Sequence, residues 1–267
     1  MKYIDVHAHL DMSRFDEDRE DVIQKAKENE ICILSSGVNP DANRKVLEYS
    51  KKYDNVLCSF GVYPIDAIIK DFPNIEDDGS RKIKSFELED ELNWIKDHRK
   101  ECVLIGEIGM DFKVVDTTDE IKKMQIKNFE RILEFSKEID KPVLIHSRGA
   151  ELECIELLEK HKCKKVIMHC FSGKKSLIKR IVDNGWFLSI PAVITRLEHF
   201  QMVAKIVPLT QILTETDAPY LSPIVGERND STSILITIKQ IAKIKEISEK
   251  SVSKQILKNA KLVLNLS

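Results

Sequence analysis

Short apolar runs alternate along the chain with segments whose apolar residues recur at helical spacing. The apolar runs are nearly continuous, which is typical of parallel strands that are covered on both faces. They begin near residues 3, 31, 56, 102, 142, 165, 186 and 211. Helical patterns cover residues 19–28, 41–52, 86–100, 119–139, 150–161 and 174–184, and the tail at 234–266 is expected to form two helices.

This alternation predicts an α/β fold built on a parallel sheet. Eight repeats with short connections favour closure into a (β/α)8 TIM barrel over an open sheet, and the chain length of 267 residues is close to the roughly 250 of such barrels. We therefore expect a single domain over residues 1–267, with the active site at the C-terminal mouth of the strands. Two longer connections, at residues 65–85 and 110–119, are expected to lie over that mouth.

Composition and charge narrow the class of protein. A hydrophobic content of 42% and a charged content of 32% describe a soluble globular protein. No apolar stretch approaches the roughly 20 residues that span a membrane, and the first residues lack the apolar core of a signal peptide, so we expect a cytoplasmic protein. The net charge of −2 excludes a protein that coats nucleic acid; any nucleic acid should be a locally bound substrate.

The six cysteines contain no Cys-x-x-Cys pair. Three of them, Cys32, Cys58 and Cys102, fall in strand-like runs, where a free cysteine behaves as a small apolar residue. Reduced structural thiols are therefore expected, in keeping with the expected compartment.

Six histidine and carboxylate residues stand at or just after the ends of predicted strands: His7, His9, Glu107, His146, His169 and Asp217. Residues that follow different strands converge at the mouth of a barrel. Imidazole nitrogens and carboxylate oxygens are the ligands of hydrolytic metal centres. Taken singly, each histidine fits a hydrogen-bonded core residue equally well and Glu107 fits a barrel-top ion pair, but the full set favours metal.

The chemistry of single residues suggests further roles. Glu107 can bridge two cations, and Asp217 can accept a proton from a metal-activated water. Asp5 and Glu215 stand two residues before candidate ligands, where they would orient a histidine or an aspartate, or form ordinary buried hydrogen bonds. Arg148 follows His146 by two residues, and its guanidinium suits a phosphate, although a surface salt bridge is the alternative.

Five sequence blocks resemble the signatures of the TatD-type deoxyribonucleases of the amidohydrolase superfamily, and they occur in the family order. The blocks are DVHAHL (residues 5–10), GEIGMD (106–111), PVLIHSR (142–148), HCFSG (169–173) and TETDAPYL (214–221). The resemblance implies a barrel in which His7, His9 and Asp217 hold one divalent cation, His146 and His169 hold a second, and Glu107 bridges them. It implies magnesium, manganese or zinc as cofactor and single-stranded DNA as substrate, cleaved from 3′ to 5′.

The chain departs from the family pattern at two places. The family commonly has Gly-x-His-Pro after the third strand, with a histidine that contacts substrate, and this chain has Gly61-Val62-Tyr63-Pro64. Tyr63 is therefore a candidate substrate contact, but it cannot carry positive charge. The family's Arg-Asn-Glu-Pro is replaced by Arg228-Asn229-Asp230-Ser231. Both departures concern substrate preference and not the metal ligands.

Three functions fit these residues. A metal-dependent nuclease is favoured because two cations and Arg148 suit a phosphodiester. A hydrolase of an amide, ester or aminoacyl bond could use the same centre, since a barrel does not fix the reaction. A non-catalytic interaction protein is disfavoured because all six candidate ligands are chemically competent. Neither a membrane nor an obligate protein partner is expected.

Overall fold

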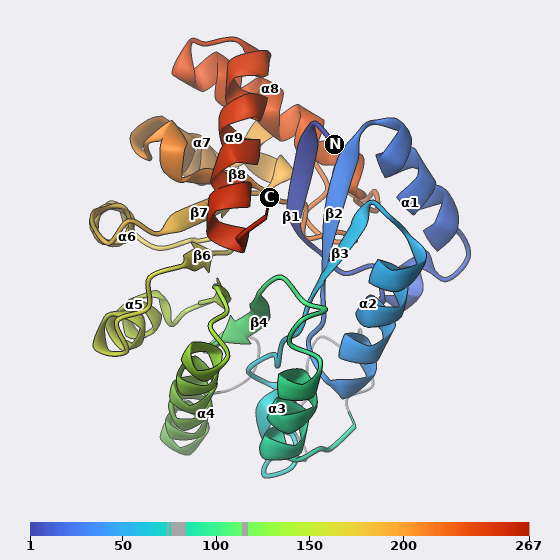
Figure 1. The fold of residues 1–267 in the computed structure, drawn as a ribbon. Coiled ribbons are helices and arrows are strands. Elements are labelled where there is room, and N and C mark those ends of the chain that lie inside the picture. The colour runs from blue at the N-terminus through green and yellow to red at the C-terminus, as the bar shows by residue number, and fades with distance from the viewer. Residues whose placement is uncertain (74, 76–83, 114–116, 267) are drawn as a thin grey trace.

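The computed structural model describes residues 1–73, 75, 84–113 and 117–266, and these contain eight parallel strands. The strands lie at the centre of the molecule, with the helices around them (Figure 1). The strands are β1 (Tyr3–Ala8), β2 (Ile31–Ser36), β3 (Val56–Ser59), β4 (Ile105–Gly109), β5 (Val143–His146), β6 (Val166–Met168), β7 (Phe187–Ile190) and β8 (Ile212–Thr214). The predicted alternation of strands and helices is confirmed.

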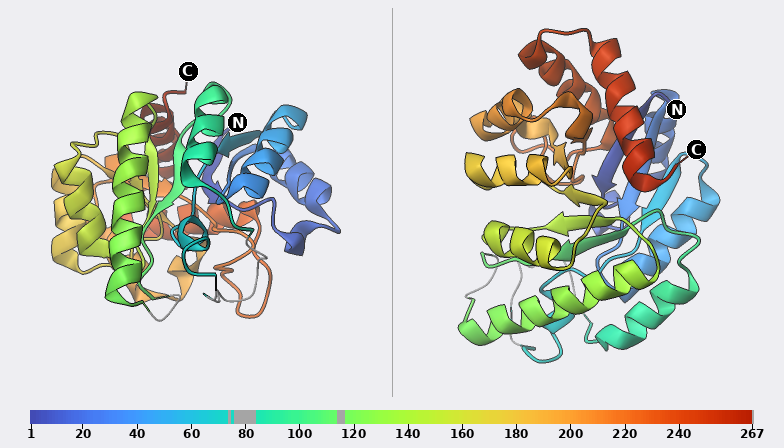
Figure 2. Two further views of the ribbon diagram at one scale, coloured as in Figure 1. Left: turned by 90° about the horizontal axis from the view of Figure 1, so that it is seen from below. Right: turned by 60° about the vertical axis from the view of Figure 1, so that its left-hand side comes forward.

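The helices of the described residues cover the outside of the strands, as two further views show (Figure 2). They are α1 (Arg19–Glu28), α2 (Pro40–Lys52), α3 (Leu88–Asp97), α4 (Asp119–Glu138), α5 (Glu151–Lys160), α6 (Lys175–Asp183), α7 (Glu198–Ile206), α8 (Ile234–Lys245) and α9 (Glu249–Leu264). All but α7 match the helical patterns of the sequence. The predicted mouth loops at 65–85 and 110–119 fall partly outside the described residues.

Local sequence signals fix where several helices begin. The side chain of Asn39 accepts a hydrogen bond from the Ala42 amide, and Pro40 is the first residue of α2. Thr118 and Ser248 cap α4 and α9 in the same way. A capping oxygen satisfies an amide that the helix leaves unpaired, and proline at the first position sacrifices no helical hydrogen bond.

The barrel consists of two hydrogen-bonded ladders, β1–β2–β3 and β4 to β8, that meet at two seams. At the first seam Phe60 bridges Ile105, and the Gly106 amide donates to the Phe60 carbonyl at 2.9 Å. At the second, Ala8 bridges Ala218, and the Asp217 amide donates to the His7 carbonyl at 2.9 Å. These contacts close the predicted (β/α)8 barrel.

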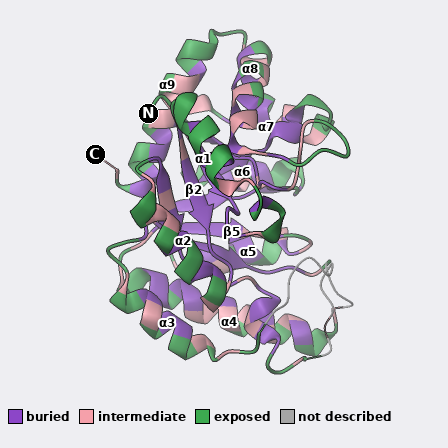
Figure 3. Cartoon of the chain, turned by 90° about the vertical axis from the view of Figure 1, so that its right-hand side faces the viewer, coloured by how far each residue is buried: buried purple, intermediate pink, exposed green. Residues whose placement is uncertain are grey.

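The barrel interior is apolar at one end. One buried cluster joins residues from around the barrel to the last helix: Ile4, Val6, Leu34, Leu104, Leu144, Ile167, Phe187, Leu213, Ala260, Val263 and Leu264. Helix α9 contacts β1 and β8, and it covers this end. The strands are buried on both faces while the outer faces of the helices are exposed (Figure 3). Polar side chains therefore gather at the opposite, C-terminal end of the strands.

No helix in the described part of the chain is both long and apolar enough to cross a membrane. All six cysteines lie within that part, and all are free thiols, as predicted.

Gly61 provides the first testable position. A Cβ atom there would overlap backbone atoms of Gly106 and Glu107 across the first seam. We expect Gly61→Ala to lower the free energy of unfolding by about 1–3 kcal/mol, the usual cost of overpacking. Thermal melting followed by circular dichroism measures the change. Lys254→Ala is the control because this side chain is exposed on α9; equal melting temperatures for the two variants would contradict the seam argument.

Candidate metal centre

The six predicted ligands meet around Glu107, which is almost wholly buried at the C-terminal end of the barrel. A nitrogen of each of the four imidazoles lies 2.7–3.9 Å from a Glu107 carboxylate oxygen. Asp217 supplies the second carboxylate, and its side chain is 18% exposed. The placement of these residues within or just after different strands therefore produces one cluster of nitrogen and oxygen atoms.

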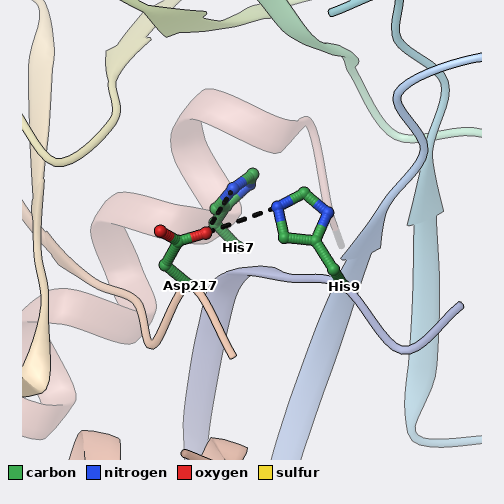
Figure 4. A group of neighbouring side chains, drawn as sticks. All are labelled: His7, His9 and Asp217. Carbon is green, nitrogen blue, oxygen red and sulfur yellow. Dashed lines mark ion pairs between the residues drawn. The ribbon is translucent and has the colours of Figure 1, made fainter. Parts of the chain in front are cut away.

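His7, His9 and Asp217 form one side of the cluster (Figure 4). Asp217 Oδ1 lies 3.4 Å from His7 Nε2 and 3.3 Å from His9 Nε2. The other carboxylate oxygen of Asp217 points away from both rings (Figure 4). One oxygen is thus directed at the imidazoles while the second is left for another contact.

His146 and His169 lie on the other side of Glu107. His146 Nδ1 is 2.7 Å from Glu107 Oε1, and His169 Nε2 is 3.9 Å from the same oxygen. A second group of potential ligand atoms consists of His7, Glu107 and His169. This division differs from the one that the resemblance implies, because His7 belongs to both groups and His146 to neither.

Each imidazole has its outer nitrogen engaged in a hydrogen bond. His9 Nδ1 donates to the Ser36 carbonyl, His7 Nδ1 bonds to Ser36 Oγ, and His169 Nδ1 donates to Glu215 Oε2 at 2.7 Å. His146 Nε2 donates to Asp111 Oδ2 at 2.7 Å. Such partners fix the tautomer, so that the lone pair of the inner nitrogen faces the cluster.

The inner atoms fit divalent cations. His7 Nε2 is buried and has no hydrogen-bond partner among the described residues, and an orphaned buried nitrogen is costly unless something shares its lone pair. Four imidazole nitrogens and two carboxylates form a donor set suited to zinc, manganese or similar ions. The chemistry of the residues therefore matches that of a metal centre.

Hydrogen bonds at the centre oppose the effect of burial on the pKa values. Burial lowers the pKa of His146, but its hydrogen bonds to Asp111 and Glu107 raise the pKa to about 9. Burial raises the pKa of Glu107, yet the hydrogen bond to His146 and the nearby His7 imidazole hold it well below its usual range. Without a cation, protons shared between imidazole and carboxylate balance the buried charge.

Two irregularities in the strand pairing direct His7 and Glu107 to the centre. Val6 and Leu104 both belong to the apolar interior. Because side chains alternate along a strand, His7, one residue after Val6, would point outward. Glu107, three residues after Leu104, would point outward for the same reason. The β1–β2 register shifts between Asp5 and Ala8, and the β4–β5 register shifts between Ile105 and Ile108. A bulge re-aims side chains in this way. Glu107 was predicted to close a strand but is the third residue of β4, two residues before its end.

Asp5 and Glu215 lie directly behind the centre. Glu215 accepts from His169, from Ser189 Oγ at 2.6 Å and from the Cys170 amide. Asp5 has no hydrogen bond to a histidine ring among the described residues. Its carboxylate accepts from the His7 amide and from the amide and the hydroxyl of Thr216, beside Asp217. Glu215 thus orients a histidine, and Asp5 holds the backbone that carries Asp217.

The predicted substrate contacts differ in their surroundings. Arg148 is exposed, and it has no hydrogen bond or ion pair from its side chain to another described residue. Tyr63 is half-buried, and its hydroxyl donates a hydrogen bond to Asp111 Oδ2 at 2.9 Å.

Two residues at the centre, Asp111 and Ser36, were not predicted to have a role. The signal for Asp111 was its place at the end of the GEIGMD block; Ser36 had no comparable signal.

A (β/α)8 barrel with buried histidines and carboxylates at its mouth defines a metal-dependent hydrolase of the barrel type. A family model described as TatD related DNase matches residues 4–265. The chain belongs to this family.

Relatives match along nearly the whole chain. An uncharacterized metal-dependent hydrolase of Methanocaldococcus jannaschii is 34% identical over 259 residues, which cover 97% of this chain and 95% of the relative. Human deoxyribonuclease TATDN3 is 34% identical over 260 residues, covering 96% and 92%. The solved Escherichia coli TatD homolog YJJV superposes with a TM-score of 0.83 at 24% identity, covering 100% and 99%, and supports the barrel fold.

Asp5 allows a test of the support behind Asp217. We expect Asp5→Ala to lower the free energy of unfolding by about 1–3 kcal/mol, because it removes the acceptor of the buried Thr216 hydroxyl and the shorter of the two hydrogen bonds of the Thr216 amide. Urea unfolding measures the change. Asp54→Ala is the control, since its ion pair with Lys27 is exposed and contributes little. Similar midpoints for both variants would contradict this role of Asp5.

Proposed function

We propose that this protein is a deoxyribonuclease that hydrolyses phosphodiester bonds of single-stranded DNA from the 3′ end, with residues 1–267 acting as one catalytic domain. The observation that carries the proposal is the arrangement of four imidazoles around the buried Glu107, with Asp217 at its open side. Family membership and the human relative's name as a deoxyribonuclease support the same reaction.

Two divalent cations, magnesium, manganese or zinc, would occupy the centre. His7, His9 and Asp217 would hold one, His146 and His169 would hold the other, and Glu107 would contact both. When bound, such cations act as Lewis acids that activate water and neutralise the charge of a phosphodiester.

The residues of the chain then have distinct tasks in hydrolysis. Water attacks phosphorus and forms the new P–O bond, and the bond to the leaving oxygen breaks as that oxygen takes a proton from solvent. Asp217 accepts the proton of this water at the oxygen that points away from His7 and His9. Arg148, exposed and without an ion pair to another described residue, binds a phosphate oxygen. Tyr63 lies close enough to the centre to contact the substrate as well.

Cleavage of labelled DNA tests the proposal. Metal-stripped protein is given single-stranded DNA labelled at the 3′ or the 5′ end, with magnesium, manganese, zinc or no metal. We expect metal-dependent release of mononucleotides from the 3′ end. Absence of cleavage with every metal, in protein that binds metal, would overturn the nuclease assignment and point to an amide, ester or aminoacyl substrate.

Asp217→Asn separates catalysis from metal binding. Asparagine keeps an oxygen that can face His7 and His9 but is a much weaker proton acceptor. We expect the variant to retain most of its bound metal and to lose hydrolysis by about 10²–10⁴-fold. Elemental analysis and the DNA assay measure the two effects. Near-normal rates would mean that another group accepts the proton.

His146→Ala tests the division of the ligands. We expect the variant to lose one of two metal equivalents, because His7, His9 and Asp217 remain in place on the other side of Glu107. Native mass spectrometry after zinc loading counts the bound ions. An unchanged stoichiometry would remove His146 from the ligand set.

A further inference from the structure

One buried carboxylate oxygen joins Tyr63 to the metal centre. Asp111 Oδ2 accepts a hydrogen bond from His146 Nε2 at 2.7 Å and another from the Tyr63 hydroxyl at 2.9 Å. Asp111 is fully buried, and the Tyr63 ring lies edge-on to the His146 ring with centroids 5.0 Å apart. Tyr63 therefore contacts His146 both through the ring and through the shared carboxylate.

Asp111 itself is held from several directions. Its amide donates to Gln125 Oε1 at 2.8 Å, and Gln125 Nε2 donates back to its carbonyl at 2.9 Å. Gln125 is buried on α4, which covers the barrel beside β4. The second carboxylate oxygen of Asp111 accepts from the Lys113 amide at 2.8 Å. These bonds fix the carboxylate in one orientation, with Oδ2 directed toward His146.

The position of Tyr63 is fixed as well. Its amide donates to the Val38 carbonyl at 2.8 Å, and its carbonyl accepts from the Ala67 amide at 3.0 Å, at the start of a 3-10 turn (Asp66–Ile68). The hydroxyl is thus presented to Asp111 from the end of β3, while Asp111 follows β4 and His146 ends β5. Three successive strand ends contribute to one hydrogen-bonded chain.

We propose that Tyr63 and Asp111 are positioning residues for His146. Asp111 holds the proton on Nε2, which leaves the Nδ1 lone pair directed at the metal centre, and the Tyr63 hydroxyl keeps Asp111 Oδ2 in place between the two donors. Tyr63 stands where the family pattern has a histidine. In this chain, the residue at that position helps to orient the metal ligand His146. The inference rests on the proposed role of His146 as a ligand but not on the identity of the substrate.

A direct substrate contact by Tyr63 makes a different prediction. Loss of its hydroxyl would then raise KM and leave metal affinity unchanged. A positioning role requires that metal affinity falls in the absence of any substrate, and that it falls only while His146 is present. Zinc binding to the protein alone therefore distinguishes the two roles, and it does so whether or not the protein cleaves DNA.

The experiment is a zinc titration of metal-stripped protein against a chromophoric chelator. His146→Ala is expected to abolish one zinc equivalent. We expect Asp111→Asn to lower the affinity for the same equivalent by about 10–100-fold, which is the usual effect of removing a partner behind a metal-binding histidine. Tyr63→Phe removes the hydrogen bond to Asp111, so we expect the affinity for the same equivalent to fall roughly two- to tenfold. Tyr53→Phe is the control, because it removes a tyrosine–carboxylate bond of 2.9 Å at an exposed position.

A double-mutant cycle completes the test. In the His146→Ala background, Tyr63→Phe should leave the remaining zinc affinity unchanged. Unchanged zinc affinity of the single variants Tyr63→Phe and Asp111→Asn would overturn the inference. So would an equal loss of affinity from Tyr63→Phe with and without His146. Melting temperatures of the metal-free proteins show whether the variants are folded, and a weakened equivalent in a variant that melts like the parent supports the proposal.

Discussion

Burial of the Glu107 carboxylate is the constraint on which the rest of the centre depends. A carboxylate removed from water is strongly unfavourable unless positive charge or hydrogen bonds compensate it. Four imidazoles surround Glu107, and each has its outer nitrogen bonded to a second group. Ser36, Asp111 and Glu215 are those second groups, and all three are buried. The four histidines of the mouth are therefore arranged around the Glu107 carboxylate, and further buried carboxylates support them from behind.

The cost of burying charge also explains why the two ends of the barrel are built from different residues. Apolar side chains from around the barrel, with α9 across them, fill the end where the strands begin. That packing excludes water and leaves the mouth as the place where histidines and carboxylates meet. Both seams between the ladders also lie at the site: Glu107 follows the Phe60–Ile105 bridge, and His7 and Asp217 join across the second seam. Closure of the barrel and assembly of the centre are thus one event.

Much of this architecture follows from periodicity in the sequence. The eight strands, most helices and the six residues that cluster at the mouth could be named because strand ends converge in a barrel. Alternation alone could not aim His7 and Glu107, because each depends on a local shift in strand register. Asp111 carried no distinctive spacing, and Tyr63 was expected at the substrate; its hydrogen bond depends on three strand ends that only tertiary structure brings together. Helix α7 was missed although Phe200, Val203 and Ala204 recur at helical spacing.

The origin of the ligands at both ends of the chain has a consequence for synthesis on the ribosome. His7 lies in the first strand, and Asp217 follows the last, so synthesis must pass residue 217 before this pair can exist. A nascent or truncated chain that stops short of β8 lacks a carboxylate and the second seam. Assembly of this pair and closure of the barrel at the second seam therefore wait until the last strand has been made.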